Sequence, residues 1–117
     1  MALSRSLGDF EFKNYEYPAK DHAVTALPEV KVQRINQDSQ FVLMACDGIW
    51  DVVTSQEAIT YIHQHAYKNK YNTNRSTLEQ IKRGVESLLE ECCAADLHES
   101  EGIGTDNMTA ILVEIGR

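Results

Sequence analysis

The chain has 117 residues, of which 18 are acidic and 11 basic, so its formal net charge is −7 at neutral pH. This length predicts a single domain at most. An acidic surface argues against binding to nucleic acid or to anionic membranes, because both depend on clustered lysine and arginine. We expect no membrane span and no signal peptide, since the sequence has no long apolar run and no basic start followed by an apolar stretch.

The first third of the chain is expected to be largely irregular. Residues 2–7 predict a short helix that stops at Gly8. Residues 9–28 are polar and aromatic with two prolines, which predicts an extended loop. Apolar and polar residues alternate over residues 29–35, which predicts an amphipathic strand.

A second strand is predicted after a turn at residues 36–39. Residues 40–46 include the continuous apolar run FVLMAC, which has the length of a strand. Such runs are typical of strands that are buried on both faces.

Two helices are predicted in the middle of the chain. Thr54 and Glu57 have the spacing of a capping box and begin a helix over residues 55–68. Ser76 and Glu79 have the same spacing and begin a second helix, residues 77–95. Both sequences repeat apolar residues at helical spacing, so each helix has one face for the core. The apolar faces consist of Ala58, Ile59, Ile62 and Ala66 in the first helix and Leu78, Ile81, Val85, Leu88, Leu89 and Cys92 in the second.

The predicted elements end with an acidic, glycine-containing loop at residues 96–107 and a last strand at residues 108–115. Strands and helices are therefore grouped apart along the chain. This order predicts the α+β class, with an antiparallel sheet of roughly three strands and two to three helices.

The three cysteines are Cys46, Cys92 and Cys93, and none of them belongs to a C-x-x-C motif. The spacing supports neither a zinc site nor a redox motif. We interpret them as buried thiols in a reducing compartment, which predicts a cytoplasmic or nuclear location.

Two aspartates stand out by their position next to apolar strands. Asp47 follows the run that ends at Cys46, and Asp106 comes just before the last strand. Two carboxylates at the ends of neighbouring strands could converge on a hard cation such as Mg²⁺ or Mn²⁺. The alternative is that each is an ordinary turn residue, with Asp47 and Gly48 forming a hairpin.

Four segments in this order resemble the C-terminal part of the PP2C family, the metal-dependent protein serine/threonine phosphatases. They are ALSRSLGDF at residues 2–10, TALPEV at 25–30, FVLMACDGIWDV at 41–52 and GTDNMT at 104–109. The resemblance covers nearly the whole chain, and it favours the metal-ligand interpretation of both aspartates over the turn interpretation.

The resemblance implies a sandwich of layers in the order α-β-β-α, with antiparallel sheets and two Mg²⁺ or Mn²⁺ ions at the sheet edges. It implies that Asp47 and Asp106 are metal ligands and that Gly48 and Asn107 support the site. The reaction it implies is hydrolysis of phosphoserine and phosphothreonine in proteins by a water molecule that the metal ions activate. The matching residues Arg5, Asp9, Trp50 and Asp51 are interpreted as structural.

The chain also departs from the family pattern. Residues 1–117 resemble the C-terminal portion of the catalytic domain, and no residue matches the metal ligands, the phosphate-binding arginine or the histidine of the N-terminal portion. The resemblance therefore places no catalytic residue other than metal ligands in this chain. We expect metal binding to be weak or absent and the chain alone to be inactive, with self-association through an exposed sheet face. The alternative function is a non-catalytic, phosphatase-like interaction or regulatory module that forms dimers.

Overall fold

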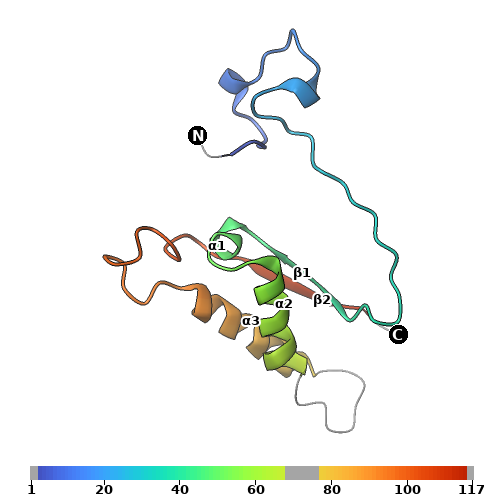
Figure 1. Ribbon diagram of the computed structural model, residues 1–117, viewed down its shortest axis with the longest axis vertical. Helices are drawn as coiled ribbons and strands as arrows, with labels where there is room; N and C mark the ends of the chain where they lie inside the picture. Colours follow the sequence, from blue (N-terminus) through green and yellow to red (C-terminus); the bar gives the residue numbers. More distant parts are fainter. Residues whose placement is uncertain (1–2, 68–76, 116–117) are drawn as a thin grey trace. The chain divides into compact units, whose positions relative to one another are not determined.

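The computed structural model describes residues 3–67 and 77–115, which fall into two compact units, Met1–Ile35 and Asn36–Arg117. None of the described helices is long and apolar enough to cross a membrane. All the α-helices and β-strands of the described residues lie in the second unit (Figure 1). They are β1 (Phe41–Ala45), α1 (Asp47–Trp50), α2 (Ser55–Ile62), α3 (Leu78–Cys92) and β2 (Ala110–Glu114).

The first unit is built from turns and one short backbone pairing. Its two 3₁₀ turns are η1 (Phe10–Phe12) and η2 (Ala19–Asp21). The helix predicted for residues 2–7 is wrong for the described residues 3–7. Instead Arg5 pairs with Thr25 in an isolated parallel bridge, in which the Thr25 N–H donates to the Ser4 carbonyl at 3.0 Å. Backbone groups that bond across the unit in this way cannot form helical bonds.

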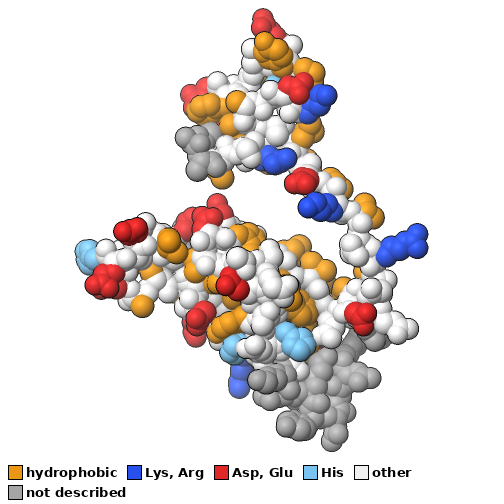
Figure 2. All heavy atoms as spheres, viewed as in Figure 1, with side chains coloured by type: hydrophobic (Ala, Val, Ile, Leu, Met, Phe, Trp, Pro, Cys, Tyr) orange, Lys and Arg blue, Asp and Glu red, His pale blue; other side chains and the backbone are white. Residues whose placement is uncertain are grey.

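The strand predicted for residues 29–35 is also wrong. No described residue pairs with this segment, and the side chain of Val32 is 93% exposed. A strand forms only when a neighbouring strand satisfies its backbone groups, so alternation alone does not produce one. Many apolar side chains of the first unit also reach its surface, as Figure 2 shows.

The second unit contains a two-stranded antiparallel sheet covered on one face by helices (Figure 1). The register pairs Phe41 with Glu114 and Ala45 with Ala110. The predicted turn before β1 is confirmed, since the Asn36 side chain accepts hydrogen bonds from the N–H groups of Asp38 and Ser39 at 2.9 and 3.1 Å. The α+β class is confirmed as well, and the described part of the chain has two strands where roughly three were predicted.

The apolar run at residues 40–46, which forms β1, was expected to be buried on both faces, and this prediction is wrong for one face. Residues alternate along β1, so Phe41 and Leu43 face the helices while Val42 and Met44 are each 47% exposed. A continuous apolar run indicates burial on both faces, but only the helical layer of the described residues covers this sheet.

Helix α2 begins where the sequence predicts a helix. Thr54 and Glu57 form the reciprocal capping box, and the hydrogen bonds that Glu57 accepts from Thr54 lower the pKa of its carboxyl group. After Ile62 the helix widens into the π-helical turn η3 (His63–Tyr67), where a uniform helix to residue 68 was predicted. Residue 68 lies outside the described residues.

The second long helix, α3, begins with a different capping box from the predicted one. Thr77 and Gln80 form it, whereas Ser76 lies outside the described residues and Glu79 pairs instead with Arg83 at 3.0 Å. Because S-T-L-E and T-L-E-Q are offset by only one residue, the pattern alone allows either start. The helix ends at Cys92, three residues before the predicted end.

The core lies between the helices and the inner face of the sheet. Its fully buried large side chains are Ile49, Ile62, Leu88 and Cys92. Tyr67 stacks on Phe41 with ring centroids 5.1 Å apart, and burial raises the pKa of Tyr67 to about 12. The prediction of three buried thiols is wrong for two of them, because Cys46 is partly buried and Cys93 is exposed.

Candidate metal-binding site

Asp47 lies where β1 passes into α1. The Cys46 backbone is extended, and Asp47 is the first residue of the short helix, with its carbonyl accepting a hydrogen bond from the Asp51 N–H at 2.8 Å. The hairpin alternative for Asp47 and Gly48 is therefore wrong. The Asp47 side chain is exposed, whereas the next two residues, Gly48 and Ile49, are buried.

Asp106 lies in the loop that leads into β2. Gly104 shapes this loop with a left-handed backbone (φ 73°), and its carbonyl accepts a hydrogen bond from the Ala94 N–H at 2.9 Å. The Asp106 carboxylate accepts a hydrogen bond from the Asn107 N–H at 2.7 Å, and the side chain is exposed. The loop thus depends on its contact with the chain that follows α3.

Cys46 joins the two aspartate-bearing segments. Its N–H donates to the Thr109 carbonyl at 3.1 Å, and its Sγ accepts a hydrogen bond from the Thr109 N–H at 3.2 Å. The same Sγ lies 3.4 Å from the Asn107 carbonyl oxygen. Asp47 follows Cys46 directly, and Asp106 precedes Asn107, so the structure brings both aspartates to one end of the sheet. The sequence predicts only a buried thiol at Cys46 and carries no sign of this linking role.

Gly48 completes the junction through its lack of a side chain. A Cβ atom at this position would overlap the backbone carbonyl of Asn107 and would lie 3.2 Å from the Met108 side chain. The backbone of the Asp47 segment can therefore approach the Asp106 segment closely only with glycine here.

Replacing Gly48 with alanine is expected to separate these two segments. Overpacking against a backbone carbonyl should lower the free energy of unfolding by about 1–3 kcal/mol. For a domain of this size the melting temperature would fall by about 4–8 °C for each kcal/mol. Thermal unfolding followed by circular dichroism measures the change, and a melting temperature equal to that of the wild-type chain would contradict the contact.

The two carboxylates suit a hard cation in type but not in number. Neither Asp47 nor Asp106 forms an ion pair with any other described residue. Within residues 3–67 and 77–115, no three His, Cys, Asp or Glu side chains come together as a metal-binding group. Mg²⁺ and Mn²⁺ sites need several oxygen ligands, so this end of the sheet supplies only part of a ligand set.

The residues interpreted as structural have distinct positions. In the second unit, the Trp50 indole N–H donates to the Ala45 carbonyl at 2.8 Å and ties α1 to β1. Asp51 is exposed, and its N–H closes α1. In the first unit, the Arg5 Nε–H donates to the Leu27 carbonyl at 3.0 Å, and Asp9 accepts a hydrogen bond from Ser6 at 2.5 Å.

Comparisons with known proteins cover nearly the whole chain. The protein phosphatase 2C family profile matches residues 1–100. The chain is 43% identical to protein phosphatase 2C homolog 3 of Schizosaccharomyces pombe over 98% of the chain and 25% of that relative. It is 40% identical to a probable protein phosphatase 2C of Caenorhabditis elegans over 97% of the chain and 29% of the relative. It is 38% identical to human protein phosphatase 1G over 95% of the chain and 20% of the relative. The chain thus spans about a quarter of the length of these curated relatives.

Proposed function

Because the chain belongs to the protein phosphatase 2C family, we propose that it supplies part of a metal-dependent enzyme that hydrolyses phosphoserine and phosphothreonine in proteins. The observation that carries this proposal is the junction at Cys46, which holds the Asp47 and Asp106 segments together at one end of the sheet. Two carboxylates at adjoining chain segments are suited to share a divalent cation.

In this proposal Asp47 and Asp106 bind Mg²⁺ or Mn²⁺ through their carboxylate oxygens. When bound, these cations activate water and neutralise charge on the phosphoryl oxygens. The chain's own contribution is positional, since Gly48 permits close approach of the two segments and the Asn107 backbone orients the Asp106 carboxylate. Both aspartates are exposed, so a phosphorylated side chain of a protein substrate could reach this end of the sheet.

The remaining metal ligands are proposed to come from sequence outside residues 1–117. On this account the chain is the C-terminal portion of a phosphatase domain, in keeping with the quarter of its relatives that it matches. Two carboxylates leave a cation with too few ligands for tight binding. The 117-residue chain by itself is therefore expected to be inactive.

A chimeric enzyme tests the proposal directly. In it, residues 1–117 replace the matching quarter of protein phosphatase 2C homolog 3 of S. pombe. With Mn²⁺ present, we expect the chimera to hydrolyse a phosphothreonine peptide and the chain alone to leave it intact. Hydrolysis by the chain alone would contradict the incomplete site, and a folded but inactive chimera would contradict the proposed function.

All three cysteines of the chain are free, and Cys93 is exposed to solvent. Exposed thiols persist without pairing or oxidation mainly where glutathione and thioredoxin keep them reduced. We therefore propose that the protein resides in a reducing compartment, the cytoplasm or the nucleus.

A second candidate function is favoured by the uncovered face of the sheet. The cross-strand pairs Val42–Val113 and Met44–Ile111 form this apolar face, and their side chains are 46–55% exposed. The two edges of the sheet pair with no other strand of residues 3–67 and 77–115. A contiguous exposed apolar face on such a sheet favours association with another chain. The chain would then act as an interaction module that pairs with a second copy of itself.

Replacing Met44 with lysine is expected to suppress this pairing. Sedimentation velocity of the wild-type chain should show a concentration-dependent dimer, and the charged variant should sediment as a monomer. Leu78→Lys serves as the matched control, because Leu78 is 82% exposed at the start of α3, away from the sheet face. A wild-type monomer at every concentration would exclude self-association through this face.

A further inference from the structure

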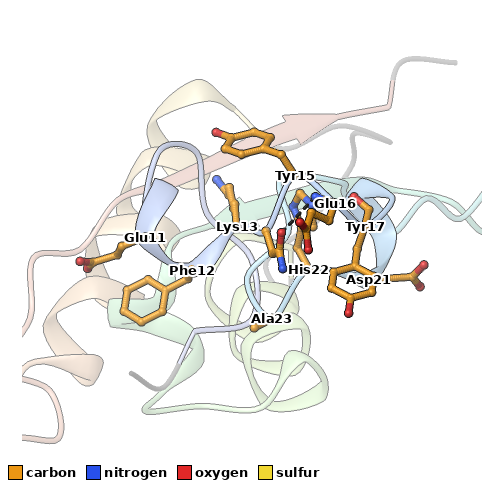
Figure 3. Close-up of a pocket in the computed structure, with 10 residues that line it drawn as sticks. Glu11, Phe12, Lys13, Tyr15, Glu16, Tyr17, Asp21, His22 and Ala23 are labelled. Atoms are coloured by element: carbon orange, nitrogen blue, oxygen red, sulfur yellow. Dashed lines mark hydrogen bonds between the residues drawn. The ribbon is translucent and has the colours of Figure 1, made fainter.

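The first unit contains an open cavity of about 860 Å³ that neither the metal site nor the sheet face explains (Figure 3). Phe12, Tyr15 and Tyr17 line it with aromatic rings. Tyr15 and Tyr17 are 72% and 59% exposed, so both rings are accessible. His22 holds this arrangement, since its ring packs edge-on against Tyr15 with centroids 6.2 Å apart, and its Nε2 lies 3.1 Å from the Tyr17 carbonyl.

The lining of this cavity is also acidic. Glu11, Glu16 and Asp21 contribute to it, and none of their carboxylates forms an ion pair with a described residue. Figure 3 shows Glu11 and Asp21 toward opposite ends, with Glu16 between them.

The one lysine of the lining does not neutralise these carboxylates. The Lys13 ammonium donates to the backbone carbonyls of Ser6, at 3.0 Å, and Gly8. It also lies 5.7 Å from the centroid of the Phe10 ring. Its ammonium group is held by neighbouring backbone, and three carboxylates against one lysine leave the lining with an excess of negative charge.

We propose that this cavity binds an arginine side chain of a polypeptide partner. A guanidinium group stacks on aromatic rings and forms paired hydrogen bonds with carboxylates, so it matches both features of the lining. Arginine fits better than lysine because the planar guanidinium can face a tyrosine ring while its edge meets a carboxylate. The proposal concerns binding alone and does not depend on the proposed phosphatase activity.

Nuclear magnetic resonance of the full ¹⁵N-labelled chain tests the proposal. The probe is a blocked nonapeptide with one arginine among glycines and serines, and its control is the same peptide with citrulline, which has nearly the same shape without the charge. We expect the arginine peptide to shift the amide signals of residues 11–23, and the citrulline peptide to leave them in place. Absence of shifts with arginine, or equal shifts with both peptides, would overturn the proposal.

Variants separate this cavity from the general attraction of an acidic chain for a cation. Tyr15→Leu and Glu16→Gln should each weaken binding about two- to fivefold, the loss typical of one exposed cation–π contact or ion pair. Glu90→Gln removes the same charge from an exposed position on α3 and should leave the affinity unchanged. If Glu90→Gln weakens binding as much as Glu16→Gln, the attraction is non-specific and the proposal is wrong.

Discussion

Replacing either Asp47 or Asp106 with asparagine is expected to lower kcat/KM of the chimeric phosphatase by at least about 100-fold. An amide keeps the shape of the side chain but removes the negative charge that a hard cation requires. The same substitutions should raise the Mn²⁺ concentration needed for half-maximal activity, an effect that a purely structural role would not produce. Steady-state kinetics over a range of Mn²⁺ concentrations measure both quantities.

The matched control for these substitutions is Asp38→Asn. Asp38 is an exposed aspartate in the turn before β1, at the other end of the strand from Asp47. Its substitution should leave kcat/KM and the Mn²⁺ requirement within about twofold of wild type, since surface changes of this kind have small effects. Wild-type activity in Asp47→Asn or Asp106→Asn would remove that residue from the ligand set.

The largest expected loss of stability follows from replacing Gly104 with alanine. A Cβ atom there would lie 2.5 Å from the Cys92 carbonyl oxygen and 2.8 Å from the Ala94 nitrogen, and the φ angle of 73° disfavours any side chain. The combined cost should be about 2–4 kcal/mol in the free energy of unfolding. Urea unfolding measures this loss. We also expect the loop that carries Asp106 to move, because the contact of Gly104 with the chain after α3 is lost.

Gly102→Ala separates the two causes of this loss. Gly102 also has a left-handed backbone, with φ of 90°, but a Cβ atom there meets nothing within 4 Å. This variant should lose only the conformational part, about 1–2 kcal/mol. Equal losses in the two glycine variants would show that the contact of Gly104 with the end of α3 contributes nothing.

The helical part of the fold could be predicted because its signals are local. The capping box at Thr54 and most of the apolar faces of α2 and α3 follow from residues within one or two turns of each other. The placement of Leu78 and Ile59 on the core faces is wrong, since their side chains are 82% and 39% exposed. The exact start of α3 could not be predicted, since two overlapping capping boxes compete there. The π-helical turn after Ile62 also has no recognisable signal in the sequence.

The strands were less predictable because they depend on partners distant in the sequence. Residues 29–35 and β1 both carry strand patterns, yet only β1 finds a partner, β2, among the described residues. The same dependence explains why the prediction that β1 is buried on both faces is wrong. Val42 and Met44 are apolar, but nothing in the described chain covers them. Their pattern agrees with a chain that spans about a quarter of its relatives.

The candidate site was identified from motifs rather than from geometry. The sequence singles out Asp47 and Asp106 by their places next to apolar strands and by the resemblance of their surroundings to a phosphatase family. The helical start at Asp47 and the Cys46 junction require the register of β1 against β2, which no local pattern specifies. The aromatic and acidic cavity at residues 11–23 could not be foreseen either, because turns rather than periodic elements bring its lining together.

Titration of Mn²⁺ into the chimeric enzyme, followed by electron paramagnetic resonance of the free ion, tests the central claim most directly. If Asp47 and Asp106 complete a metal centre, the chimera should take up Mn²⁺ at concentrations at least about tenfold lower than the variant carrying both asparagine substitutions. The 117-residue chain alone should bind as poorly as that variant. Equal Mn²⁺ affinity in the chimera and the doubly substituted variant would contradict the account.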